Sequence, residues 1–228
     1  MTREDYVKIV NNKTPDDSDS MRIRSENSRI LIEVLKLLDK SAPGYEPCQK
    51  LLARSYYHWL PDYFFTAPAS STGKYHPDFA NRSNGLMLHS LAVARIAIQL
   101  FDILSAIDED DYKPMKNLLV TSAWLHDMFK YGDPDKYAPG CFTTHEHPEL
   151  AAEFLETPEV IAIAKSYGLT WTDMDCMANL IRTHMGPYTT SKYSNVVLEK
   201  PVAPMQHLLF QADYLASRKE NDVVKDVM

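Results

Sequence analysis

The chain has 228 residues, 45% of them hydrophobic, which is enough for one substantial hydrophobic core. Its formal net charge is −7 and no cluster of lysines and arginines occurs, which argues against a protein that grips long nucleic acids through a basic surface. Three widely spaced cysteines, no apolar stretch of membrane-span length and no signal-peptide pattern lead us to expect a cytoplasmic protein with free thiols and no membrane contact.

Helical patterns begin after a polar N-terminal segment. Residues 1–27 are expected to form an arm or a short helix. Ser28 is a candidate cap for an amphipathic helix at 29–40, and residues 46–60 are predicted to form a second helix. Residues 61–84 are rich in proline, serine and glycine. They predict a loop much longer than an ordinary connection, and such loops are often functional.

The rest of the chain is predicted to be helical as well, apart from a second long loop at 185–202. The predicted helices cover residues 85–105, 114–130, 148–156, 158–166, 172–184 and 203–218. Few β-branched residues alternate with polar ones, which argues against a sheet-rich protein. The sequence therefore predicts an all-α, single-domain helical bundle over residues 28–228.

Six ionisable residues recur through these helices in the order H…HD…H…H…D. They are His89, His126, Asp127, His147, His184 and Asp213. Imidazole nitrogens and carboxylates are the ligands that borderline divalent metals prefer. Most of these residues have apolar neighbours at helical spacing, so they should face the core. Burying so many ionisable groups is unfavourable unless a metal compensates, and the pattern therefore predicts a metal site.

The adjacent pair His126-Asp127 is the most specific part of this pattern. Both residues can serve the same metal, or the carboxylate can bridge two. His126, Asp127 and Lys130 should share one face of the predicted helix. His147 precedes Pro148, a residue preferred in the first turn, and is therefore expected at the start of a helix.

Two stretches of the sequence carry a family resemblance. Leu125-His-Asp-Met-Phe-Lys130 resembles the HD-x-x-K element of the HD-domain superfamily of metal-dependent phosphohydrolases. Residues 67–77 are similar to a segment of a subgroup that includes phage-borne HD proteins and HD-type 3′–5′ exoribonucleases. The resemblance spans residues 60–220, roughly, and implies an HD-type domain with its metal-binding core in that range. One departure is Met185, which stands where many relatives have a second histidine.

The six residues are assigned to one or two divalent transition-metal ions, among Mn, Fe, Co, Ni and Zn. The first ion is assigned four ligands, His89, His126, Asp127 and Asp213. Asp127 is expected to bridge to a second ion held by His147 and His184. His145 stays open as a further ligand, although it should lie farther out in the loop.

The expected chemistry is hydrolysis of a phosphate ester or anhydride. Two divalent ions would outweigh the two aspartates, and the excess positive charge suits phosphate oxygens. Water bound to such ions ionises near neutral pH and can act as the nucleophile. Catalytic roles are assigned to Asp127 and Lys130. Lys130, Lys74 and His76 are the candidates for binding substrate phosphate.

The acidic net charge favours a small phosphorylated substrate, such as a nucleotide, over a long nucleic acid. Tyr75 and Tyr188 are candidates for stacking on a base. Two alternatives stay open. The likeness of residues 67–77 to exoribonucleases allows a 3′–5′ exonuclease on single-stranded nucleic acid. Some HD-domain proteins use a similar ligand set as di-iron oxygenases. Relatives often dimerise, so the resemblance also allows a homo-oligomer.

Overall fold

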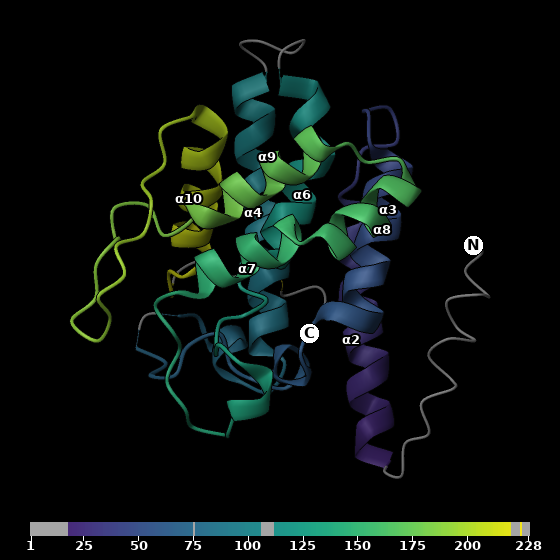
Figure 1. Ribbon diagram of the computed structural model, residues 1–228. Coiled ribbons are helices and arrows are strands. Elements are labelled where there is room, and N and C mark those ends of the chain that lie inside the picture. Colours follow the sequence, from purple (N-terminus) through teal and green to yellow (C-terminus); the bar gives the residue numbers. More distant parts are fainter. Residues whose placement is uncertain (1–17, 75, 106–111, 220–223, 225–228) are drawn as a thin grey trace.

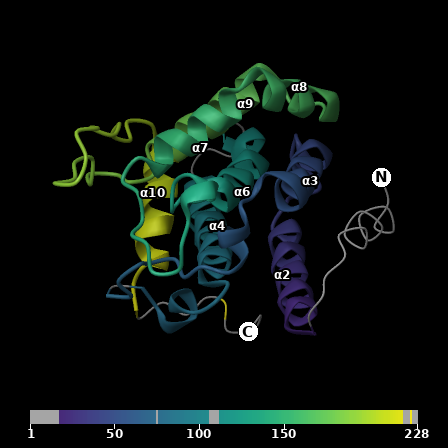
Figure 2. The ribbon, with the colours of Figure 1, turned by 60° about the horizontal axis from the view of Figure 1, so that its bottom comes forward.

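Two helices with little exposed surface form the centre of the fold (Figures 1 and 2). They are α4 (Gly85–Ser105) and α6 (Lys116–Leu125), which pack against each other. Residues 85–94 of α4 are all buried, as is every residue of α6 from Asn117 onward. A helix that is buried on all sides needs neighbours to cover it, and the remaining helices provide that cover.

The outer helices are arranged around this central pair. They are α2 (Ser18–Lys36), α3 (Tyr45–Arg54), α7 (His147–Glu156), α8 (Pro158–Tyr167), α9 (Trp171–Arg182) and α10 (Pro204–Ala216). α10 packs on α4, while α9 packs on both α6 and α7. The computed structural model describes residues 18–74, 76–105, 112–219 and 224. These residues form eight α-helices and no β-strand, which confirms the all-α prediction.

From the sequence we expected no apolar stretch long enough to span a membrane, and the composition of α4 corrects that expectation. By length and composition alone, its stretch Gly85–Leu104 is apolar enough to cross a membrane. Within the fold, 67% of its most apolar window is buried, and the helix packs against α6 and α10. The same apolar residues are those expected of a helix at the centre of a protein core.

The first helices differ in their bounds from the prediction. α2 begins at Ser18 and ends at Lys36, whereas the sequence predicted a helix at 29–40; residues 1–17 lie outside the described residues. Ser28 is therefore inside the helix, with its Oγ 3.3 Å from the hydroxyl of Tyr56, and is not a cap. The predicted helix at 46–60 is α3, continued by a π-helical turn at Ser55–Trp59.

Two helices end earlier than expected, and both ends matter for the site. α6 ends at Leu125 and α9 at Arg182, whereas the predicted helices extended to 130 and 184. Tight turns follow, in which the amide of Lys130 donates to the carbonyl of Asp127 and that of His184 donates to Ile181. Such three-residue bonds often close the end of a helix. Three of the proposed ligands therefore lie in turns just beyond helices.

The long loop at 61–84 contains two short 3₁₀ helices, Asp62–Phe65 and Asp78–Asn81. It is anchored to the turn that follows α6. The hydroxyl of Tyr63 donates to the carbonyl of Gly132 at 2.8 Å, and that of Tyr131 donates to Pro68 at 2.6 Å. The loop is thereby held beside the start of α4 and the residues after Leu125.

Asn117, buried in α6, joins the N-terminal part of the chain to the central helix. Its Nδ2 lies 2.9–3.3 Å from the carbonyls of Asp39, Ala42 and Pro43, and its Oδ1 accepts from the amide of Asp39 at 2.8 Å. These contacts satisfy the backbone of the turn between α2 and α3. Without Asn117, several buried or partly buried backbone groups of that turn would lose their partner.

We expect Asn117→Ala to lower the free energy of unfolding by about 2–3 kcal/mol, because it leaves several buried or partly buried backbone groups unsatisfied. Asn179→Ala is a matched control, since its Nδ2 bonds only the carbonyl of Asp175 within the same helix. That control should lower stability by less than about 1 kcal/mol. Urea unfolding of both variants measures the difference. Equal losses would show that the contacts to residues 39–43 contribute nothing specific.

Candidate metal centre

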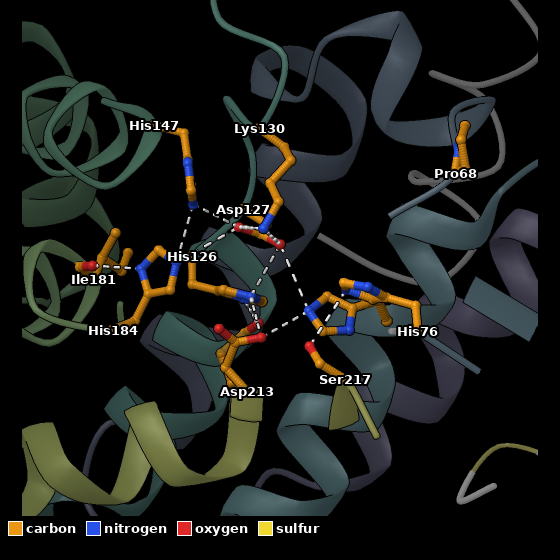
Figure 3. Close-up of polar contacts among 12 residues, drawn as sticks. Pro68, His76, His126, Asp127, Lys130, His147, Ile181, His184, Asp213 and Ser217 are labelled. Atoms are coloured by element: carbon orange, nitrogen blue, oxygen red, sulfur yellow. Dashed lines mark hydrogen bonds and ion pairs between the residues drawn. The ribbon is translucent and has the colours of Figure 1, made fainter. Parts of the chain in front are cut away.

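Five segments of the chain bring the six candidate ligands together (Figure 3). His89 lies on α4. Asp213 lies on α10, and His147 is the first residue of α7. His126 and Asp127 follow α6 directly, and His184 follows α9. The five members of this group other than Asp213 are buried, and the Asp213 side chain is only 14% exposed. The structure thus gathers all six residues that the sequence singled out.

Asp127 lies between two groups of histidines, and its two oxygens face different groups. Oδ2 is 3.3 Å from Nε2 of His126 and 3.6 Å from Nε2 of His89. Oδ1 is 3.0 Å from Nε2 of His147 and 3.6 Å from Nε2 of His184. A carboxylate with an oxygen on each side can serve two ions at once.

Each side of Asp127 offers a set of atoms that could hold a metal. The ligand atoms of His89, His126 and Asp213 lie within 4.8 Å of one another, and so do those of His126, Asp127 and His184. Nε2 of His147 is 3.1 Å from Nε2 of His184, which places it with the second set. The division of the ligands between two ions stays a prediction, because the second set also includes His126, which the sequence analysis assigned to the first ion.

The local backbone orients three of the imidazole rings in the same way. Nδ1 of His126 faces the carbonyl of Ala123 at 2.8 Å. Nδ1 of His147 faces Thr144, and Nδ1 of His184 faces Ile181, each at 2.7 Å. In every case the carbonyl belongs to the residue three positions earlier. A protonated Nδ1 donates there and leaves the Nε2 lone pair directed toward Asp127, which is the usual arrangement of metal-ligating histidines.

Several buried ring nitrogens have no hydrogen-bond partner. Both nitrogens of His89 are in this state, as is Nε2 of His126. Nε2 of His89 lies 3.0 Å from Oδ1 of Asp213 but not in hydrogen-bond geometry. Orphaned polar atoms in a core are unfavourable, and a divalent ion would satisfy them. The donor set of nitrogens and carboxylates therefore fits such an ion.

The charges at the centre are stabilised by one another. Burial alone would raise the pKa of Asp127, but His126 and Lys130 beside it hold that pKa well below its usual range. Burial would likewise raise the pKa of Asp213, and His89 and His126 lower it. Burial opposes the charged form of Lys130, yet Asp127 and Asp213 raise its pKa. Both carboxylates and the ammonium are therefore ionised at neutral pH.

The residues predicted to bind substrate lie in three different positions. Nζ of Lys130 is 3.0 and 2.9 Å from the two oxygens of Asp127. The ring of His76 packs against that of His89, with centroids 5.3 Å apart, and its Nε2 is 3.3 Å from Oγ of Ser217. Burial lowers the pKa of His76 to about 3, so the ring is uncharged at neutral pH. Lys74 is exposed.

A cavity of about 610 Å³ opens beside the centre. Its walls come from the turn after α6, the segment before α7 and the loop after α9. They consist of Lys130, Phe142, Thr143, Thr144, His145, Glu146, His147, Met185, Ser191, Tyr193 and Ser194. Its volume is in the range of small-molecule sites. Lys130 and His147 connect the cavity directly to the candidate metal centre.

The sequence did not single out the cavity residues Phe142, Ser191 and Ser194. The sequence signal that could have found them is their position, since they lie in the segments next to His147 and His184. His145 lines the cavity, with Nε2 3.3 Å from the carbonyl of Thr189, and belongs to neither ligand group. Of the two tyrosines proposed to stack on a base, Tyr188 is exposed but does not line this cavity, and Tyr75 lies outside the described residues.

Comparison with known proteins identifies the family. The family model described as the HD domain matches residues 87–218, and the chain therefore belongs to the HD domain family. The matched segment contains all six candidate ligands and Lys130. HD domains bind divalent metals and are generally metal-dependent hydrolases. No curated protein and no solved structure matches the chain. The match begins after residues 67–77, so their likeness to one subgroup stays a hypothesis.

We expect Asp127→Ala to lose most of the bound metal, because both candidate ligand sets include or face this carboxylate. Removing a partner behind a ligand already weakens metal affinity by about 10–100-fold, and removing the ligand itself should cost at least as much. Asp133→Ala is the control, since Asp133 is exposed and caps a short helix nearby. Elemental analysis of the purified proteins gives the result. Equal metal content in the wild type and in both variants would contradict the assignment of Asp127 as a metal ligand.

We also expect two ions rather than one. Anomalous scattering from crystals soaked in manganese should give two peaks roughly 3.5–4 Å apart, the usual spacing of two-metal sites. One peak should lie near His89 and Asp213, and the other near His147 and His184. A single peak at saturating manganese would restrict the centre to one ion.

Proposed function

We propose that the protein is a metal-dependent phosphohydrolase that acts on nucleotides or other small phosphate esters and anhydrides. The observation that carries this proposal is the position of Asp127. Its carboxylate separates two groups of histidines and is contacted by the Lys130 ammonium, which lines the cavity. Membership of the HD domain family supports a hydrolytic reaction, and the cavity supports a small substrate.

The ligand set suits phosphate chemistry. Divalent ions bound there would make hydroxide available near neutral pH and would stabilise negative charge on phosphoryl oxygens. Asp127 and Asp213 contribute two negative charges, and the histidines that surround them are neutral ligands. Two ions together with Lys130 would leave the centre with a net positive charge, which favours an anionic substrate.

Lys130 has a role of its own in this proposal. Its side chain is 12% exposed, and its ammonium reaches both oxygens of Asp127 while lying in the cavity wall. It can therefore hold the bridging carboxylate and also donate to a phosphoryl oxygen. Charge on that oxygen increases in the transition state, so the contact should accelerate the reaction more than it strengthens substrate binding. His76, being neutral, can contribute a hydrogen bond but not a charge.

A small substrate is favoured over a long nucleic acid. The chain carries a net charge of −7, and phosphate neutralisation dominates the binding of nucleic-acid polymers. Lys130 is the only lysine or arginine among the residues that line the described cavity. A polymer would require a row of cationic contacts outside this wall.

A substrate screen tests the reaction class. The manganese-loaded protein should release phosphate from nucleotides in air and under argon alike, since hydrolysis consumes water and no oxygen. A labelled single-stranded oligonucleotide in the same assay should be a poor substrate. Turnover that requires oxygen would replace this proposal with the di-iron oxygenase, and shortening of the oligonucleotide from its 3′ end would replace it with the exonuclease.

We expect Lys130→Ala to reduce kcat/KM by about 100-fold or more, the usual effect of removing one donor to developing charge. The fall should be mainly in kcat. Lys136→Ala is the matched control, because Lys136 lies on the same loop, is exposed and pairs with Asp133. Its kinetics should equal those of the wild type. Metal content should be measured in both variants, since a parallel loss of metal from Lys130→Ala would make it a residue that supports the centre and not a catalytic one.

A further inference from the structure

The wall of the cavity is assembled from two segments that are bound to each other. One, residues 141–146, leads into His147, and the other, residues 185–198, follows His184. The carboxylate of Glu146 accepts hydrogen bonds from the hydroxyls of Thr144 and Ser194, one from each segment. Nε2 of His145 lies 3.3 Å from the carbonyl of Thr189. These contacts hold the wall in shape without a ligand.

The longer of these segments is also folded on itself. The amide of Leu198 donates to the carbonyl of Thr189 at 2.9 Å, and Ser191 pairs with Ser194 in an isolated antiparallel bridge. Leu198 is buried and fixes the base of the loop. The tip that remains, at Lys192 and Tyr193, therefore projects from a supported base.

The two ends of the cavity differ in chemistry. At the inner end are Lys130 and His147, both of which contact Asp127. At the outer end are two aromatic rings, Phe142 with 78% of its surface exposed and Tyr193 with 85%. The Lys192 ammonium lies over the Tyr193 ring, 4.7 Å from its centroid, and covers one face of it. Rings this exposed bury little surface in the fold, and both line the space that a ligand would enter.

The charge of the wall restricts how many phosphates can enter. Lys130 is the single lysine or arginine among the described lining residues, while Glu146 is acidic. One phosphate at the inner end is matched by Lys130 and the candidate metal centre. A second or third phosphate would extend along hydroxyls and past this carboxylate.

We propose that the cavity binds a nucleoside monophosphate, with its phosphate at Lys130 and its base on the rings of Phe142 and Tyr193. The proposal rests on the phosphohydrolase function above and specifies its substrate. Every nucleobase has a π face, and stacking on aromatic side chains is a common and sequence-tolerant way to bind one. The cavity wall also carries Ser and Thr hydroxyls, which suit a sugar. A sugar phosphate without a base would leave the two rings unused.

The reaction would be hydrolysis of the phosphomonoester. Water forms a new bond to phosphorus, the bond from phosphorus to the sugar oxygen breaks, and a proton from the water passes to that oxygen. The products are a nucleoside and inorganic phosphate. No oxidant or reductant takes part.

Kinetics with manganese-loaded protein test the assignment. The substrates are purine and pyrimidine nucleoside 5′-monophosphates, the corresponding triphosphates, and ribose 5-phosphate as the substrate without a base. Phe142→Ala and Tyr193→Ala should each raise KM for the monophosphates roughly tenfold, with little change in kcat. Hydrolysis of ribose 5-phosphate should be slower in the wild type and unaffected by either change. Tyr188→Ala, on the same loop but outside the cavity, is the control and should change nothing.

A binding measurement separates this proposal from the proposed function. Manganese-loaded wild-type protein should bind, in calorimetry, a phosphonate analogue of adenosine 5′-monophosphate in which a P–C bond replaces the scissile P–O bond, and changing both rings with Phe142→Ala and Tyr193→Ala should abolish that binding. If the rings are required for binding but no compound releases phosphate from the wild type, the cavity assignment stands and the hydrolytic function fails. If phosphate is released equally from ribose 5-phosphate and monophosphates, or faster from triphosphates, the function stands and this proposal is overturned. Both rings are exposed, so the variants should fold.

Discussion

The Asp127 carboxylate is a charge placed in the core of a helical protein, and much of the fold is organised around stabilising it. An isolated carboxylate there would be highly unfavourable, so it must be met by positive charge, by hydrogen bonds or by metal. Lys130 provides one positive charge from three residues away. The Nε2 atoms of four histidines approach the same two oxygens. Bringing those side chains together requires α4, α7 and α9 to meet at the end of α6.

Most of the candidate ligands lie at the ends of helices and not on their faces. α6 ends immediately before His126, α9 ends just before His184, and α7 begins at His147. A tight turn can direct a side chain along the helix axis, where a continuous helix would direct it sideways. The ligands after α6 and α9 therefore meet at one place without taking up positions inside those two helices. α4 and α10 are the exceptions, each contributing a single ligand from within the helix.

The residue pattern was sufficient to predict the all-α fold and the set of residues that come together, because buried ionisable groups on apolar helices have few explanations. It was not sufficient for the ends of α6 and α9, since residues 126–130 and 183–184 have no strong helix-breaking signal and the packing of the site decides their conformation. The cavity was missed for a different reason. Phe142 and Tyr193 belong to irregular segments, which are joined by the contacts of Glu146 with Ser194 and of His145 with Thr189.

The shared orientation of His126, His147 and His184 has a consequence for how the centre is assembled. Each ring is aligned by a carbonyl three residues earlier in its own segment, so its direction does not depend on the other ligands. A protein that has lost its ions would keep these imidazoles poised and would have little rotamer entropy left to lose when ions return. Uptake of metal would then be governed by access through the cavity, and not by rearrangement of the fold.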